Sequence, residues 1–236
     1  MKKAWNKLIH YFTKEKKKFA KGICFDKLFM IFIIGSIFGA YYEQIFYLIT
    51  KYLETGTIVW ALRRGVIYGP FNVIYGFGAV IMVCLLADKN HKWYQTFLYG
   101  ALLGGGFEYI MSFLQETFTH TISWDYSDHF LNFQGRTSIP FMIGWGFFTF
   151  AFIHWIYPKL SDWIEKIPYN LGKITTKVLL IFMAFNMAIS WTAIIRQTLR
   201  RNNIPAFTPV GRFYDKHYND EFLSKYFPNM SSKERK

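Results

Sequence analysis

The stretch that decides the fold is Leu28–Thr50, LFMIFIIGSIFGAYYEQIFYLIT, in which Glu43 is the one charged residue. A helix needs about 20 predominantly apolar residues to cross the ~30 Å hydrocarbon core of a bilayer. This stretch is long enough to do so, whereas a helix of a water-soluble domain normally keeps one polar face. It therefore predicts a transmembrane helix that carries a carboxylate in its second half.

Four further stretches have the same character. They are Val66–Ala87, Trp93–Phe118, Thr137–Tyr157 and Ile174–Ile195. Their Asp, Glu, Lys and Arg residues are limited to Glu108, Glu116 and Lys177. We therefore predict an all-α membrane protein, a compact bundle of five transmembrane helices over residues 28–195. The stretch 56–70, which is rich in glycine and arginine, would make a sixth transmembrane segment if it re-entered the membrane.

Closely spaced glycines predict tight helix packing within this bundle. Small residues let two backbones approach each other, and this drives association in lipid, where no hydrophobic force acts between helices. The candidate positions are Gly35 with Gly39, Gly76 with Gly78, Gly100 with Gly104, and Gly144 with Gly146.

The basic residues point to lipid as a partner. The formal net charge is +13, and Lys and Arg concentrate in residues 1–27 and 196–236. Basic segments beside membrane helices favour anionic headgroups. The apolar spacing within residues 4–12 predicts an amphipathic helix in the N-terminal segment, and residues 196–236 predict a basic tail that is soluble or interfacial. No helix-turn-helix, zinc-ligand or RNA-binding pattern is present, so nucleic acid is not an expected partner.

The orientation in the membrane is nearly balanced by charge. The first helix usually decides, and cytoplasmic segments carry the excess of Lys and Arg, so residues 1–27 predict a cytoplasmic N-terminus. Five crossings then place the basic residues 196–236 on the opposite side, in conflict with the same rule. A sixth segment would bring both ends to the cytoplasmic side.

Polar residues gather toward one face of this predicted bundle. Glu43 and Glu108 approach the same face if the spans alternate in direction. Glu116 follows Glu108 at i+8 and shares its side of the helix. The segments that connect the spans on that face add further polar groups. The candidate cluster is Glu43, Arg64, Glu108, Glu116, Trp124, Asp125, Asn132 and Arg136.

Three interpretations of this cluster stay open. The charges form ion pairs that hold the loops to the helices, or they line a polar path or substrate pocket, or they perform acid–base or metal chemistry. The sequence contains no G-x-S-x-G, H-E-x-x-H or P-loop pattern. We therefore expect no catalytic activity in this chain alone, no metal and no cofactor.

The same residues carry a resemblance to a known family. Gly35-Ser36-x-x-Gly39-x-x-x-Glu43 resembles the first motif of the bacterial Putative ABC-transporter type IV family, the CmpB-like permeases. Arg64-Gly65-x-x-x-Gly69-Pro70, followed by Tyr75-Gly76-x-Gly78, resembles the second. The family's third motif is matched by Glu108-Tyr109, Glu116, Trp124-Asp125-Tyr126-Ser127, Asn132 and Gly135-Arg136. The C-terminal ending of the family is similar to Phe227-Pro228-Asn229-Met230. Val73 stands where the family often has proline. This difference would affect a kink in the second span more than the chemistry of the site.

The resemblance implies a multi-pass protein of the bacterial cell membrane that acts as a transporter permease subunit, and it adds Tyr75 to the candidate cluster. An ATP-driven transporter would need a separate ATPase subunit, because this chain has no Walker A motif. Five or six spans are few for a whole pathway, so a partner permease or a homo-oligomer is expected. The alternatives are a membrane-embedded enzyme acting on lipid or lipid-linked substrates and a non-transporting accessory membrane protein.

Overall fold

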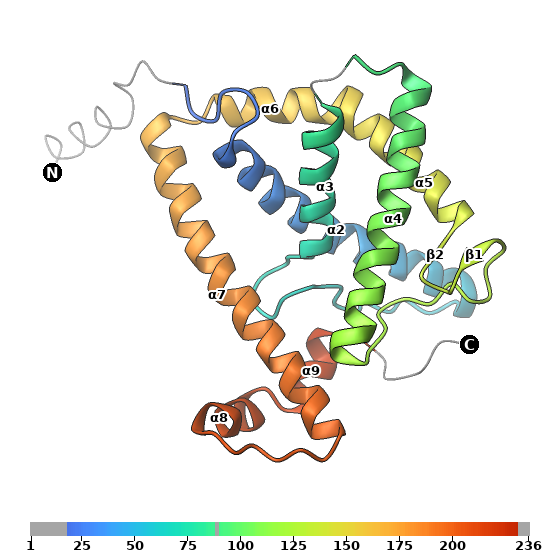
Figure 1. The fold of residues 1–236 in the computed structure, drawn as a ribbon, viewed down its shortest axis with the longest axis vertical. Helices are drawn as coiled ribbons and strands as arrows, with labels where there is room; N and C mark the ends of the chain where they lie inside the picture. The colour runs from blue at the N-terminus through green and yellow to red at the C-terminus, as the bar shows by residue number, and fades with distance from the viewer. Residues whose placement is uncertain (1–17, 88–89, 231–236) are drawn as a thin grey trace, which may run out of the picture.

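The computed structural model describes residues 18–87 and 90–230, and it confirms a helical protein (Figure 1). Four helical stretches are long and apolar enough to cross a membrane, judged by length and composition: α2 (Phe25–Thr55), α4 (Trp93–Thr119), the continuous stretch Ile139–Glu165 and α7 (Tyr169–Arg201). Large apolar side chains such as those of Phe147 and Phe185 are exposed on them. Extensive apolar surface of this kind suits lipid and not water, and the chain is a multi-pass membrane protein.

The second predicted span is only partly helical. Its helix α3 is Val73–Leu86, 14 residues, whereas the sequence predicted Val66–Ala87. At 1.5 Å per residue α3 is about 21 Å long. Gly69 has a φ of 77°, in the left-handed region, and Pro70 lacks the backbone N–H that a helix interior requires. The chain therefore enters the bundle in a non-helical form and becomes helical only after Pro70, at Val73.

The fourth predicted span continues beyond its expected end. It consists of α5 (Ile139–Ala151), the π-helical turn η1 (Phe152–Ile156) and α6 (Tyr157–Glu165). Pro158 lies in the first turn of α6, where its missing N–H interrupts the regular ladder, and the wider π turn precedes it. The helix persists beyond the predicted end at Tyr157 to Glu165, and α6 runs along the top of the bundle in Figure 1.

A short β-hairpin between α4 and α5 departs from the all-helical prediction. Strand β1 (Asn132–Phe133) pairs antiparallel with β2 (Thr137–Ser138). Gly135 closes the turn with a φ of 63°, a conformation that glycine adopts without strain. Two-residue strands are too short to leave a readable period in the sequence, which is why this feature was not predicted.

Glycines bring two helix pairs into close contact, α2 with α3 and α4 with α5. A Cβ atom at each of four of these positions would lie between 2.2 and 2.5 Å from its nearest neighbour: Gly39 against Tyr75, Gly76 against Ser36, Gly100 against Thr149 and Gly104 against Trp145. These contacts confirm the predicted close packing. Gly144 is different, because a Cβ there would meet no atom within 4 Å.

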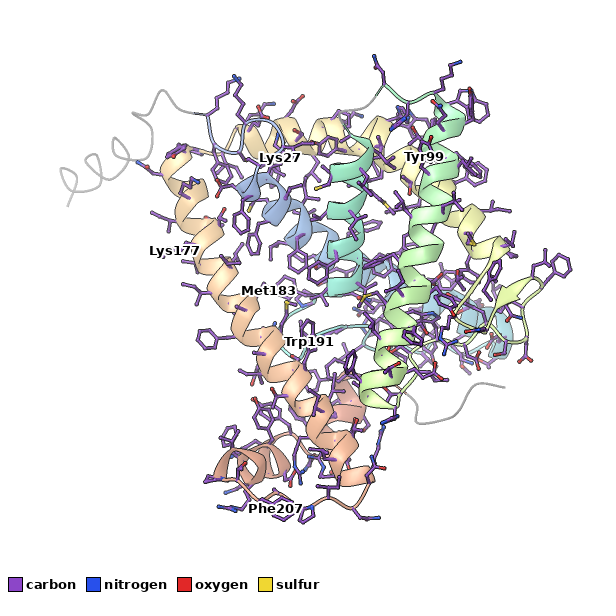
Figure 2. The ribbon with its side chains drawn as sticks, in the orientation of Figure 1. Lys27, Tyr99, Lys177, Met183, Trp191 and Phe207 are labelled. Carbon is purple, nitrogen blue, oxygen red and sulfur yellow. The ribbon has the colours of Figure 1, made fainter. Side chains whose placement is uncertain are left out.

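Ion pairs hold both ends of the bundle. At the upper end, Lys27 is buried below α6, as Figure 2 shows, and donates hydrogen bonds to Ser161 and Glu165. At the lower end, helices α8 (Pro209–His217) and α9 (Asp220–Tyr226) fold back against α7. Asp215 accepts hydrogen bonds from Arg196 and Arg200 at 2.8 and 2.7 Å. The hydrogen bond from Arg196, more than any other interaction, lowers the pKa of the Asp215 carboxyl.

Within its described part, residues 196–230, the predicted basic tail contains the end of α7 and the helices α8 and α9. The amphipathic N-terminal helix predicted over residues 4–12 lies outside the described residues.

We expect Gly76→Ala to lower the midpoint of thermal unfolding measured in detergent. The added Cβ would lie 2.6 Å from the backbone oxygen of Phe32, and overpacking of this kind costs about 1–3 kcal/mol. Gly106→Ala is the matched control, because no atom lies within 4 Å of its Cβ. The control should unfold at the wild-type midpoint or slightly above it, since alanine is the better helix former. Equal midpoints for both variants would contradict the close α2–α3 contact.

Candidate functional site

A cavity of about 390 Å³ lies among α2, α3, α4, α5 and the loops next to the hairpin. Its charged lining consists of Glu43, Glu108 and Arg63. Most of its remaining lining is aromatic: Tyr42, Phe46, Tyr47, Tyr75, Phe107, Trp124, Tyr126, Phe141, Trp145 and Phe148. The predicted proximity of Glu43 and Glu108 is thus confirmed, because both carboxylates face one cavity.

The position of Glu43 depends on the contact between α2 and α3. Glu43 follows Gly39 by four residues and so lies on the same side of α2. Tyr75 of α3 occupies the space that Gly39 leaves open. The polar groups of Tyr75 and Asn72 lie beside Glu43 and act on it, as do the charges of Arg63 and Glu108. A glycine and the loop before α3 together orient this carboxylate.

Glu108 on α4 is held by neutral donors. Tyr126 donates to one carboxylate oxygen at 2.8 Å, and Thr137 donates to the other at 3.0 Å. Burial is the largest cause that raises the pKa of the Tyr126 hydroxyl, with the Glu108 charge second, so this hydroxyl stays protonated as a donor. The hairpin loop thereby fixes the direction of the carboxylate at the cavity wall.

Glu116 has a different setting, two turns further along α4. It accepts a hydrogen bond from Arg136 at 2.7 Å in an ion pair, and the Arg136 side chain is only 13% exposed. The guanidinium also lies over the rings of Tyr109 and Phe113, at 5.5 and 5.6 Å. Neither Glu116 nor Arg136 lines the cavity. This pair fits the first interpretation of the cluster, in which charges hold a loop to a helix.

The two arginines before α3 have separate surroundings. Arg63 lines the cavity and lies 4.0 Å from the centre of the Tyr47 ring. Arg64, which the sequence placed in the cluster, lies 5.7 Å from the ring of Tyr226 in α9 and does not line the cavity. Neighbouring side chains on a non-helical chain point in different directions, and nothing in the sequence indicates which of the two faces the cavity.

The remaining predicted residues divide in the same way. Trp124 lines the cavity and donates from its indole N–H to the Arg136 carbonyl at 2.9 Å. Asp125 accepts from the backbone N–H and the hydroxyl of Ser127. Asn132 donates to the carbonyls of Ser127 and His129. Asp125 and Asn132 shape the loop that carries Trp124 and do not line the cavity.

Several residues at the site were not in the predicted cluster. Arg63, Tyr126 and Thr137 follow directly from the structure, and Asn72 comes from the non-helical entry to α3. Tyr126 lies inside the Trp124–Ser127 motif, so the motif held a signal for it. Thr137 depends on the hairpin, which the sequence did not indicate.

The carboxylates at the cavity have no ion-pair partner within 4.0 Å in the described part of the chain, and Arg63, which lines the same cavity, acts on Glu43 through its charge from further away. Glu43 and Glu108 form none of the ion pairs found there within 4.0 Å, whereas Glu116 does. No cluster of three or more His, Cys, Asp or Glu side chains placed to hold a metal ion occurs in residues 18–87 and 90–230. The site therefore offers two carboxylates, one arginine and an aromatic wall to a ligand.

A family model described as Putative ABC-transporter type IV matches residues 30–191, more than half of the chain. The matched range contains every residue of the predicted cluster and every residue that lines the cavity except Asn229. No curated protein matches the chain, and no solved structure matches it.

We expect Glu116→Gln to loosen the hairpin loop, because the largely buried Arg136 guanidinium would lose its charged partner. The loss of a hydrogen bond to a charged group costs about 1–3 kcal/mol. The measurement is limited proteolysis of the loop 120–136 together with the unfolding midpoint in detergent. Glu54→Gln, at an exposed ion pair with Lys51, is the control and should change little. Wild-type protection of the loop in Glu116→Gln would show that the pair does not hold it.

Proposed function

The chain belongs to the Putative ABC-transporter type IV family of membrane proteins, and from this premise we propose that it is a transporter-type membrane subunit whose substrate site is the cavity at Glu43 and Glu108. The observation that carries the proposal is the pair of carboxylates at that cavity without an ion-pair partner among the described residues. Ionisable groups within a membrane protein are costly, and they commonly mark substrate or ion pathways.

The contrast with Glu116 supports a functional role for these two residues. Where a carboxylate serves only to fasten a loop, an arginine pairs with it, as Arg136 does at 2.7 Å. Glu43 and Glu108 are instead oriented by neutral hydroxyl and amide groups. An arrangement of this kind keeps a carboxylate directed at the cavity and leaves its charge available to a ligand.

We further propose five membrane crossings, with α3 as the short one. The buried apolar residues Val66, Ile67 and Phe71 precede α3 and lengthen its apolar path, since non-helical chain advances up to about 3.3 Å per residue. The ribbon in Figure 1 is compatible with this, because α2, α4 and α7 lead away from the α6 end while α3 and α5 lead toward it. The N-terminal segment and the helices α8 and α9 would then lie on opposite sides of the membrane.

The proposal includes partners that this chain does not supply. ATP-driven transport needs an ATPase, and the absence of a Walker A motif assigns it to a separate chain. The expected setting is the bacterial cell membrane, with a partner permease or a second copy of this chain to complete the pathway.

The test is to purify the full-length protein from its native membrane in mild detergent and to identify co-purifying chains by mass spectrometry. We expect an ATPase subunit, and ATP hydrolysis by the complex that rises when a lipid extract of the same cells is added. Glu108→Gln should insert and assemble normally, because glutamine has nearly the same shape: its amide oxygen accepts from one of the two hydroxyls, and its NH2 group can donate to the oxygen of the other. It should reduce the stimulated rate about tenfold, the effect of losing one charge-assisted contact.

Two results would argue against this function. If the lipid extract stimulated ATP hydrolysis by Glu108→Gln as fully as that of the wild type, the cavity would not be the substrate site. Chemical conversion of a lipid by the chain alone would favour the alternative, a membrane-embedded enzyme.

The topology is testable with cysteines, since Cys24 and Cys84 are both free. In a Cys24→Ser, Cys84→Ser background, we expect single cysteines at the exposed positions Lys21 and Lys216 to react with a membrane-impermeant maleimide from opposite sides. With the N-terminus cytoplasmic, Lys216→Cys should react in intact cells and Lys21→Cys only after permeabilisation. Labelling of both from one side would contradict five crossings and require an even number.

A further inference from the structure

Two cavities of different character adjoin along α2. The polar cavity of about 390 Å³ includes Tyr42 to Thr50 of this helix, and a second cavity of about 180 Å³ includes Ile31 to Phe38. At 1.5 Å per residue these stretches are about 12 and 10 Å long. The cavities share the lining residues Ile74, Tyr75, Phe107, Trp145 and Phe148. A single elongated molecule would therefore meet a polar region first and an apolar region next.

The second cavity has no charged residue in its lining. It is formed by aliphatic and aromatic side chains and by three glycines, Gly35, Gly78 and Gly104. Apart from Tyr75 and Trp145, which also line the polar cavity, the side chains of this lining are apolar. Such a lining favours the burial of a hydrocarbon chain by about 0.8 kcal/mol per methylene.

The polar cavity has the chemistry of an ammonium site. Glu43 and Glu108 supply negative charge without a cationic partner within 4.0 Å in the described part of the chain. Aromatic rings, among them those of Tyr42, Tyr75 and Trp124, form most of the wall. Aromatic faces attract organic cations through the ring quadrupole, and aromatic cages are a recurring means of binding quaternary ammonium groups. Carboxylates and rings together select a positive, weakly hydrated head group.

Arg63 gives the same cavity a position for a negative group beside the positive one. Its Nε atom is buried without a hydrogen-bond partner among the described residues, and its guanidinium stacks on Tyr47. A guanidinium matches a phosphate well. A head group with an ammonium and a neighbouring phosphate would therefore occupy the carboxylates and the arginine at once.

We propose that the cavity binds the head group of an ammonium-bearing amphiphile and that the adjoining apolar cavity holds part of its hydrocarbon chain. The inference rests on the proposed function in one respect, that this amphiphile is the substrate. Two sources share the chemistry: a zwitterionic lipid such as phosphatidylethanolamine and a single-chain cationic amphiphile.

The experiment measures binding to the purified full-length protein in an uncharged sugar-headed detergent, by calorimetry and by tryptophan fluorescence. The probe is dodecyltrimethylammonium. Tetramethylammonium has the head without the chain, and dodecanoate has a chain of equal length with the opposite charge. We expect saturable binding of dodecyltrimethylammonium, binding of tetramethylammonium at least about tenfold weaker, and no competition by dodecanoate.

The affinities of variants for the probe show whether it binds in the cavity. Glu43→Gln and Glu108→Gln should each weaken the cationic probe about tenfold or more, the loss expected for one charge-assisted contact. Glu54→Gln, an acid at the exposed end of α2 outside both cavities, should bind as the wild type does. Unfolding midpoints for all three establish that the variants are folded. Equal binding of dodecanoate, or wild-type affinity in both cavity variants, would overturn the proposal.

Native mass spectrometry with added lipids separates the two sources. Retention of phosphatidylethanolamine over phosphatidylglycerol, reduced by Arg63→Gln, would assign the site to the zwitterionic lipid. Binding of dodecyltrimethylammonium without such retention would assign it to single-chain cations. Because these measurements need neither ATP nor a partner, binding without transport would overturn the proposed function alone. Transport that depends on Glu108 without ammonium binding would overturn this inference alone.

Discussion

The close approach of α2 and α3 is the constraint on which the site depends. A Cβ at Gly39 would lie 2.2 Å from the Tyr75 ring, and one at Gly76 would lie 2.2 Å from the Ser36 hydroxyl. Only glycine at these positions lets the helices lie so near each other. The approach places Tyr75 against Gly39 and brings its side chain to Glu43, one turn later on α2. Close packing of the two helices thus positions the polar groups that orient the first carboxylate.

The protein handles its embedded charges in two ways. Lys27 with Glu165 and Glu116 with Arg136 are paired within the chain, as expected where the desolvation of one charge is offset by another. Glu43 and Glu108 are stabilised by hydrogen bonds from uncharged groups and face a cavity. The difference separates ion-paired residues that hold the fold from carboxylates that face a cavity. The ion-pair interpretation fits Glu116 with Arg136, and the substrate-pocket interpretation of Glu43 and Glu108 is the one that we propose.

The sequence predicted the helical membrane architecture and the meeting of Glu43 with Glu108, because span length and helix periodicity depend on local patterns. It predicted less well what depends on non-helical chain. Gly69 and Pro70 marked where α3 begins, yet α3 is shorter than the apolar run. The hairpin, whose Thr137 donates a hydrogen bond to Glu108, left no periodic pattern in the sequence. The sequence placed Arg64 in the cluster, whereas the structure places Arg63 at the cavity. The two side chains are directed by tertiary contacts, Arg63 with Tyr47 and Arg64 with Tyr226, which the sequence does not reveal.

The loop before α3 has one further consequence. Arg63 reaches the cavity, while Arg64, the next residue, lies over Tyr226 of α9, and Tyr68 is hydrogen-bonded to Tyr218 at 2.8 Å. One peptide unit therefore separates a group that contacts the cavity from a group that contacts the C-terminal helices. Adjacent residues of one loop therefore join the wall of the cavity to the C-terminal helices.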